Sequence, residues 1–192
     1  MKIFSPLFEL VLRWSRHPKA PWYLAGLSFA ESSFFPIPPD VMLMPLVVAQ
    51  PKHAWRLATI TTVFSVLGGM AGFAIGYFAI EAIEPWLHDL GYWDAYEHSQ
   101  AWFLKWGFWA VLAAGFSPIP YKIFTIAAGA MAMPFAPFLL ASVVGRASRF
   151  FLVAGLLYWG GERVEHMLRR YIDILGWLFV GLLVVAYFLL SG

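Results

Sequence analysis

The chain has 192 residues, of which 61% are hydrophobic and 12% are charged, and its mean hydropathy is +0.70. A soluble domain of this length could not bury so much apolar surface, so the composition predicts an integral membrane protein. The net charge of +2 is too small to indicate a nucleic-acid partner, and the absence of cysteine excludes disulfides and thiolate chemistry.

Residues 1–19 are predicted to form an interfacial helix that lies on the membrane surface. Apolar residues recur there at helical spacing from Ile3 to Trp14, and Glu9 and Arg13 interrupt them, which is not typical of a signal peptide. Basic residues outnumber the single glutamate in this segment. By the positive-inside rule, the N-terminus is therefore expected in the cytoplasm.

Residues 21–51 are predicted to enter the membrane and return to the same side as a re-entrant hairpin. Its arms, 22–35 and 40–51, pass the midplane of a hydrocarbon core about 30 Å thick at about 1.5 Å per residue. Proline interrupts the helix at the tip, and unpaired backbone at that depth must be covered by protein or water. The tip prolines are Pro36, Pro38 and Pro39.

Residues 57–80 contain no Asp, Glu, Lys or Arg and are predicted to form a transmembrane helix. The segment 81–100 carries five acidic residues and no Lys or Arg, which indicates a loop on the far side of the membrane. Gly68, Gly72 and Gly76 give the helix a face of small residues. We favour packing of this face against a hairpin, with a second copy of the chain as the alternative partner.

The second half repeats the first in the opposite orientation. The sequence of residues 34–40, FFPIPPD, returns as FSPIPYK at residues 116–122. Residues 105–134 are predicted to form a second re-entrant hairpin, followed by transmembrane helices at 136–160 and 174–192. The tip prolines of this hairpin are Pro118 and Pro120. A hairpin plus a crossing in each half makes an inverted repeat, as in many secondary transporters.

Charged residues fall inside these predicted membrane segments, namely Glu31, Asp40, Lys122, Arg146 and Arg149. Each unpaired charge costs about 2.5–3.5 kcal/mol at a helix centre, so the group must be paired or hydrated. Facing hairpin tips would bring the two acids near Lys122, and the two arginines share one helix face. We interpret the cations as a binding site for an anionic lipid phosphate and the acids as proton-coupling or gating groups. The alternative is a structural ion-pair cluster that joins the hairpins.

Three motifs together resemble the DedA (VTT-domain) superfamily, and most closely the YqaA branch of bacterial inner-membrane proteins. They are ESSFFPIPPD at 31–40, FSPIPYK at 116–122 with the AAG at 127–129 that follows it, and GRASRF at 145–150. The resemblance covers about residues 20–160. It implies facing re-entrant hairpins, a location in the bacterial cytoplasmic (inner) membrane, and a link to the movement of phospholipids or undecaprenyl phosphate.

The resemblance also assigns residues. Glu31 and Asp40 match the acidic pair of the family, and Lys122 stands near the position where the second hairpin usually has Arg. Many members carry Trp near the position of Arg149. Lysine lacks the bidentate fork that arginine offers to a phosphate.

The leading hypothesis is a flippase- or scramblase-like membrane transporter for an anionic lipid, whose movement could be proton-coupled and which supports envelope homeostasis. A proton-coupled carrier of a small solute and a structural assembly factor without transport are the alternatives. The sequence contains no Walker loop, HExxH motif or Rossmann fingerprint, so we expect neither an enzyme nor a cofactor. His88 and His98 match no standard ligand spacing, so we expect no metal site.

Overall fold

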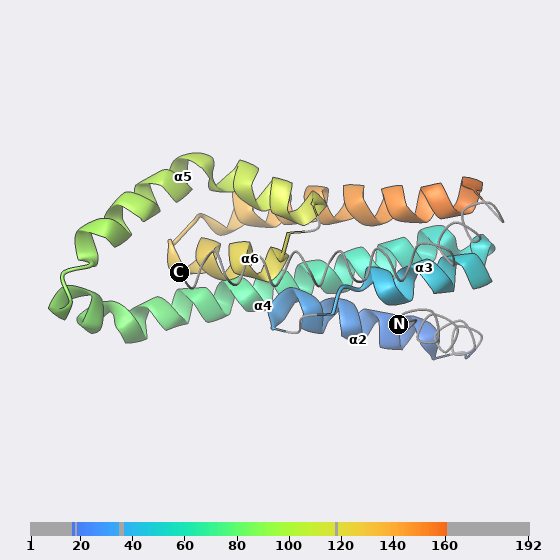
Figure 1. Cartoon of the computed structure of the whole chain (residues 1–192), viewed down its shortest axis with the longest axis horizontal. Helices are drawn as coiled ribbons and strands as arrows, with labels where there is room; N and C mark the ends of the chain where they lie inside the picture. Colours follow the sequence, from blue (N-terminus) through green and yellow to red (C-terminus); the bar gives the residue numbers. More distant parts are fainter. Residues whose placement is uncertain (1–16, 18, 35–36, 118, 161–192) are drawn as a thin grey trace, which may run out of the picture.

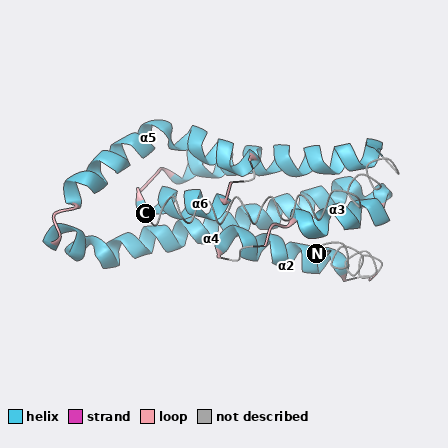
Figure 2. Cartoon of the chain, in the orientation of Figure 1, coloured by secondary structure: helices cyan, strands magenta, loops and turns pink. Residues whose placement is uncertain are grey.

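The computed structural model describes residues 17, 19–34, 37–117 and 119–160 (Figure 1). Every regular element within these ranges is a helix, and none is a strand (Figure 2). The predicted all-α class is therefore confirmed for the described part of the chain. The predicted crossing at 174–192, and the interfacial helix apart from residues 17 and 19, lie outside the described residues.

The first proline run separates two helices. α2 (Ala20–Ser33) ends just before it, and α3 (Asp40–Ala49) begins directly after Pro39. Figure 1 shows that the chain reverses direction between them near the middle of the long axis. These bounds differ from the predicted arms by at most two residues, because proline fixes where a helix can continue.

α4 (Ala54–Asp89) is the longest helix, and a short 3₁₀ turn, Pro51–His53, precedes it. At 1.5 Å per residue, its 36 residues span about 54 Å, which exceeds the hydrocarbon core of a membrane. The predicted crossing at 57–80 lies inside this helix. Figure 1 shows that α4 runs the length of the molecule.

The predicted loop at 81–100 is wrong. α4 continues to Asp89 and α5 (Trp93–Phe116) begins four residues later, so the connection is confined to Leu90, Gly91 and Tyr92. Gly91 has a φ of 72°, a conformation that glycine adopts without steric cost. The acidic residues lie on exposed turns of the two helices. Their charge therefore indicates that these turns face solvent, and it does not mark the end of a helix.

The second proline run separates α5 from α6 (Tyr121–Ala130), and a further helix, Phe135–Gly160, completes the described part. α5 begins 12 residues before the predicted arm at 105–117, because the acidic segment that was expected to be a loop is helical. The Tyr96 hydroxyl of α5 donates to the Ala130 carbonyl at 2.7 Å, which ties the start of α5 to the end of α6.

α4 packs closely against both α2 and α6. A Cβ atom added at Gly68 would lie 2.3 Å from the Phe29 carbonyl oxygen of α2. A Cβ added at Gly76 would lie 1.9 Å from the Ile126 carbonyl oxygen of α6. The small-residue face therefore meets helices of the same chain, which agrees with the packing we favoured from the sequence.

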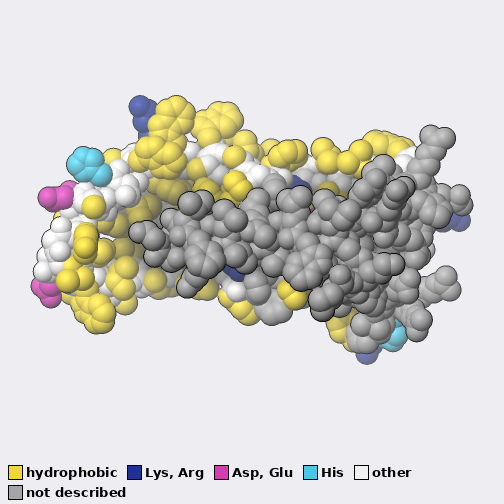
Figure 3. Space-filling model, in the orientation of Figure 1, with side chains coloured by type: hydrophobic (Ala, Val, Ile, Leu, Met, Phe, Trp, Pro, Cys, Tyr) yellow, Lys and Arg dark blue, Asp and Glu magenta, His cyan; other side chains and the backbone are white. Residues whose placement is uncertain are grey.

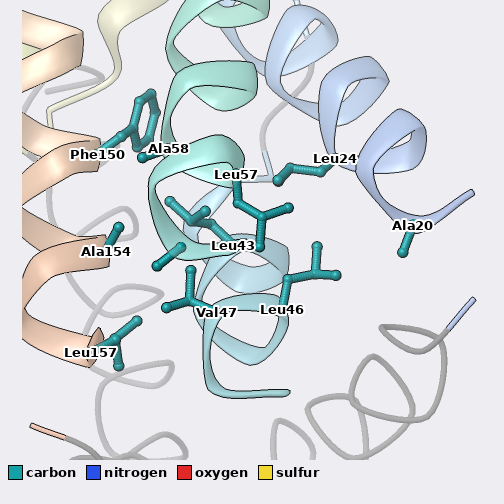
Figure 4. Close-up of a cluster of buried hydrophobic side chains, with 11 residues drawn as sticks. Ala20, Leu24, Leu43, Leu46, Val47, Leu57, Ala58, Phe150, Ala154 and Leu157 are labelled. Atoms are coloured by element: carbon teal, nitrogen blue, oxygen red, sulfur yellow. The ribbon is translucent and has the colours of Figure 1, made fainter. Parts of the chain in front are cut away.

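Two clusters of buried apolar side chains make up the core. The first lies between α2, α3, α4 and the Phe135–Gly160 helix (Figure 4); it includes Leu24, Leu43, Leu46, Val47, Leu57, Ala58, Phe150, Ala154 and Leu157. The second joins α5 and α6 to the first half of the Phe135–Gly160 helix; it includes Phe103, Val111, Ala114, Tyr121, Ala128, Met133 and Phe138.

The surface remains largely apolar (Figure 3). Two helical stretches, Pro51–Asp89 and Phe135–Gly160, are long and apolar enough to cross a membrane, with mean hydropathies of 1.8 and 1.5. Most of each stretch is not buried within the protein. Basic residues at Lys52 and Arg56 are exposed where α4 begins, and acidic residues are exposed where it ends. This combination suits a helix with its flanks in lipid and its ends in water.

Candidate functional site

The two arginines of the Phe135–Gly160 helix form ion pairs with the two acidic residues that flank the first proline run. Arg146 pairs with Glu31, near the end of α2, with 2.7 Å between Nη2 and Oε2. Arg149 pairs with Asp40, the first residue of α3. The four side chains are at least four-fifths buried, so these pairs are screened little by solvent.

Arg146 is fully enclosed, with an exposed fraction of 2%. Its Nε donates to the Ser65 hydroxyl of α4 at 2.5 Å, and its Nη2 donates to the Ser32 hydroxyl at 3.1 Å as well as to Glu31. Ser32 and Ser65 also hydrogen-bond each other at 2.6 Å. This network joins α2, α4 and the Phe135–Gly160 helix through one guanidinium group.

Two aromatic rings hold the Arg146 guanidinium in place. Its Cζ lies 4.7 Å from the centre of the Tyr121 ring and 4.8 Å from the centre of the Phe150 ring. Each ring belongs to a different one of the two apolar clusters. The cation therefore lies between the two clusters, and cation–π attraction adds to its hydrogen bonds.

Arg149 is more accessible, with 18% of its side chain exposed. Its Nη2 donates to the Asp40 carboxylate, and its Nη1 donates to the Ser117 carbonyl oxygen. Ser117 caps the C-terminus of α5 at the second proline run, where backbone carbonyls lack helical partners. One guanidinium group thus contacts the edges of both proline runs.

Buried polar atoms without a hydrogen-bond partner gather at the same place. In the described ranges, the side-chain atoms of this kind are Asp40 Oδ1, the Tyr121 hydroxyl and Ser142 Oγ. Ser142 and the Tyr121 hydroxyl are polar neighbours whose contact lacks the geometry of a full hydrogen bond, and Ser142 lies one helical turn before Arg146. Buried polar groups in proteins are normally hydrogen-bonded, so the concentration of unused capacity here distinguishes this region from the rest of the described core.

The charged residues and the described prolines predicted for the site lie around the two helix breaks. The ion pairs of the two carboxylates involve the arginines, and the expected proximity of Lys122 to the carboxylates stays a prediction. Lys122 is the second residue of α6 and is partly buried. Pro38, Pro39 and Pro120 border the helix breaks; Pro36 and Pro118 lie outside the described residues.

Sequence reasoning missed the neutral partners of the arginines, namely Ser32, Ser65, the Tyr121 and Phe150 rings and the Ser117 carbonyl. Tyr121 and Ser117 lie inside the repeated motif, and Ser32 follows Glu31, so proximity to the motif was a usable signal. Ser65 had no such signal, because a lone serine in an apolar helix commonly bonds its own backbone.

No group of three or more His, Asp or Glu side chains in the part that the structure covers is arranged to hold a metal ion. The polar groups gathered here are basic, acidic and hydroxyl side chains inside an apolar helical protein. Such a site can hold an anion or exchange protons. In the part that the structure describes, an all-helical arrangement with buried, paired charges and two helices long and apolar enough to cross a membrane is compatible with an integral membrane protein.

The comparisons with known proteins identify the family. The model of the VTT domain matches residues 37–159, and the chain belongs to this family, the DedA family. An uncharacterized protein of Haemophilus influenzae is 46% identical over the full length of both chains. An uncharacterized protein of Histophilus somni is 44% identical, again over the full length of both. No solved structure matches the chain. Family membership and the apolar helices together indicate a membrane protein with a role in membrane transport or homeostasis.

Proposed function

We propose that this protein moves an anionic lipid phosphate across the bacterial inner membrane, through a site between two re-entrant hairpins, and that it is not an enzyme. The observation that carries the proposal is the buried cluster around Arg146 and Arg149. It holds two cations, two acids and an Asp40 carboxylate oxygen without a hydrogen-bond partner, at the helix breaks of an apolar protein. Buried ionisable residues in membrane proteins typically mark a substrate or ion pathway.

The arrangement of the helices supports two hairpins of opposite orientation. In Figure 1 the α2–α3 pair opens toward one end of the molecule and the α5–α6 pair toward the other, with both breaks near the middle. α4 and Phe135–Gly160 would then be the crossing helices of the two halves. The exposed basic residues at the start of α4 support a cytoplasmic location for that end and for the N-terminus in this proposal.

The chemistry of the site favours a phosphate group as the substrate. Arginine forms two parallel hydrogen bonds to phosphate, and Lys122 lies in the first turn of a helix, where the dipole also attracts anions. A lipid headgroup is already at the membrane, and the apolar flanks of the helices would allow its acyl chains to stay in lipid. Glu31 and Asp40 would exchange protons or gate the site, because each can release its arginine when neutral.

Reconstitution tests the proposal. Purified protein in liposomes is assayed for movement of a fluorescent phospholipid and of undecaprenyl phosphate, each with and without a proton gradient. We expect movement by wild type and at least a tenfold loss in Arg149→Ala and Lys122→Ala, with Arg56→Gln as a control for a surface cation. Absence of movement of either lipid by folded wild type would contradict a lipid substrate and favour a small soluble solute.

A structural role is the second candidate, and the closed hydrogen bonding of Arg146 favours it. If the charges serve only to join helices, exchanging the partners should preserve function. The double variant Asp40→Arg with Arg149→Asp tests this in a strain that depends on the protein. Full activity of the exchanged pair would support the structural role, whereas loss of activity in a stably inserted protein would support transport.

A further inference from the structure

Arg149 differs from Arg146 in what its removal would disconnect. Arg146 joins α2 and α4 to the Phe135–Gly160 helix by hydrogen bonds, and it touches the second proline run only through the ring of Tyr121, without a hydrogen bond there. Arg149 donates to Asp40 after the first proline run and to the Ser117 carbonyl before the second. These are two edges of the two helix breaks, and one side chain connects them.

The two arginines also differ in their capacity to change partners. Arg146 is enclosed by two serines, a carboxylate and two rings. Arg149 is partly exposed, and the carboxylate that it holds uses one oxygen while the other, Asp40 Oδ1, has no partner. A phosphate presents more acceptor oxygens and more charge than such a carboxylate, so it can compete for the Arg149 guanidinium.

We propose that Arg149 is the arginine that takes up the phosphate group, and that by leaving Asp40 and Ser117 for the phosphate it releases the two helix breaks from each other. Arg146 remains bound throughout and positions the helix that carries Arg149. The inference rests on the proposed function, since it names the residue of that same site which receives the anion. It assigns to one residue both recognition of the substrate and the opening of the site.

Asp40 acts in this scheme as the resident anion. It is the first residue of α3, where the helix dipole stabilises a negative charge. When a phosphate takes the guanidinium, Asp40 keeps this helix end as its remaining favourable contact. A phosphate monoester should therefore compete better than a diester, because it carries more charge at neutral pH.

A distance measurement between the two breaks tests the proposal. The chain has no cysteine, so Ile37→Cys and Ile119→Cys give one pair of labels without further changes. Both positions are exposed, and they are equivalent in the two repeats. Pulsed electron paramagnetic resonance on spin-labelled protein in nanodiscs reports the distance distribution. The additions are inorganic phosphate, phosphatidic acid and phosphatidylglycerol, with phosphatidylcholine nanodiscs as the reference.

We expect one narrow distribution in phosphatidylcholine, and a longer or broader one with phosphatidic acid. The Arg149→Gln variant should show the broad distribution without any anion and should not respond to phosphatidic acid. Arg56→Gln should behave as wild type. The Asp40→Asn variant lacks the competing carboxylate charge, so it should respond at a concentration about tenfold lower than wild type. A response to inorganic phosphate alone would assign the site to the free anion, and a response to the lipid alone to the headgroup.

Two results would overturn the inference. One is an unchanged narrow distribution in Arg149→Gln that elutes as folded protein; the other is a wild type that responds to none of the phosphates. The liposome assay is independent of both results. A protein that opens with phosphate but moves no lipid would refute the proposed function alone, and a protein that moves lipid with fixed breaks would refute the inference alone.

Discussion

Two neighbouring arginines on one helix face have different surroundings and should respond differently to replacement. Arg146 is closed in by hydrogen bonds and rings, whereas Arg149 bridges two helix breaks and is partly exposed. Removing one partner of a buried pair leaves the other charge uncompensated. Replacement of the enclosed Arg146 should therefore affect stability more, and replacement of the partly exposed Arg149 should affect activity more.

The Arg146→Gln variant should be strongly destabilised. It leaves the Glu31 carboxylate buried without its cation, a change that typically costs about 3–5 kcal/mol. Thermal unfolding in detergent, followed by size-exclusion fluorescence, measures the effect. Arg149→Gln is the matched control and should unfold closer to wild type; equal losses in both variants would contradict the difference drawn between the two residues.

Removal of the Tyr121 hydroxyl should cost less than about 1 kcal/mol, because its contact with Ser142 lacks the geometry of a full hydrogen bond. The matched variant is Tyr96→Phe, which loses the hydrogen bond to the Ala130 carbonyl and should be destabilised by about 1 kcal/mol. Melting temperatures of Tyr121→Phe, Tyr96→Phe and wild type are compared. A larger loss in Tyr121→Phe would show that its hydroxyl has a partner in the folded protein.

Charged residues inside apolar segments could be singled out from the sequence, but the ion pairs that they form could not. Glu31 and Asp40 were recognised because charges in apolar segments are rare. Their partners lie 115 and 109 residues away in the chain, so pairing depends on how the helices cross. The position of the Ser117 carbonyl could not be predicted either, because a backbone group has no signature in a sequence.

At the scale of the elements, the glycines of α4 determine how closely it approaches α2 and α6. Gly76 lies against the Ile126 backbone, and Gly129 of α6 lies against the Phe73 backbone in return. Backbone atoms cannot move aside as the end of a side chain can. These contacts therefore fix the α4–α6 distance along the second half of α6.

Gly76→Ala should be destabilised by more than 2 kcal/mol, in the range of severe overpacking, since the added Cβ would lie 1.9 Å from a carbonyl oxygen. Gly26→Ala in α2 is the control, because a Cβ there meets nothing within 4 Å. It should be neutral or stabilising by up to about 1 kcal/mol through helix propensity. Similar melting temperatures for the two variants would contradict the close α4–α6 contact.

The helix ends at the prolines could be predicted from the sequence, whereas the helix ends inferred from the acidic residues of segment 81–100 were wrong. The ends around Pro38, Pro39 and Pro120 agree with the sequence because proline excludes a continuous helix. The acidic segment 81–100 was interpreted as a loop, yet its apolar residues Ile83, Trp86 and Leu90 recur at helical spacing. That periodicity was the better signal, since acidic residues are fully compatible with an exposed helix.

At the scale of the whole molecule, charge separates the two ends. Exposed basic residues stand where α4 begins, and exposed acidic residues stand where α4 and α5 meet. Figure 3 shows acidic side chains at the α4–α5 end. The length of α4, about 54 Å, allows both ends to reach water while the middle of the helix crosses the lipid.

Single cysteines test this orientation in the cysteine-free chain. Lys52→Cys and Asp89→Cys place a thiol at either end of α4, and both positions are exposed. A membrane-impermeant maleimide added to intact spheroplasts should label the cysteine at position 89 and not that at 52. Labelling should be reversed in inverted membrane vesicles, and labelling of position 52 from outside would contradict the proposed topology.

The pairing of distant residues has a consequence for synthesis. A ribosome adds about 5–20 residues per second, so Arg146 and Arg149 follow Glu31 and Asp40 after roughly 5–20 s. During that interval the first half is in the membrane without the cations that will neutralise it. Its carboxylates must stay at the lipid–water boundary, take up protons or rest against the insertion machinery. Chains truncated before residue 146 should therefore be recognised by membrane quality-control proteases, even though their first crossing helix is complete.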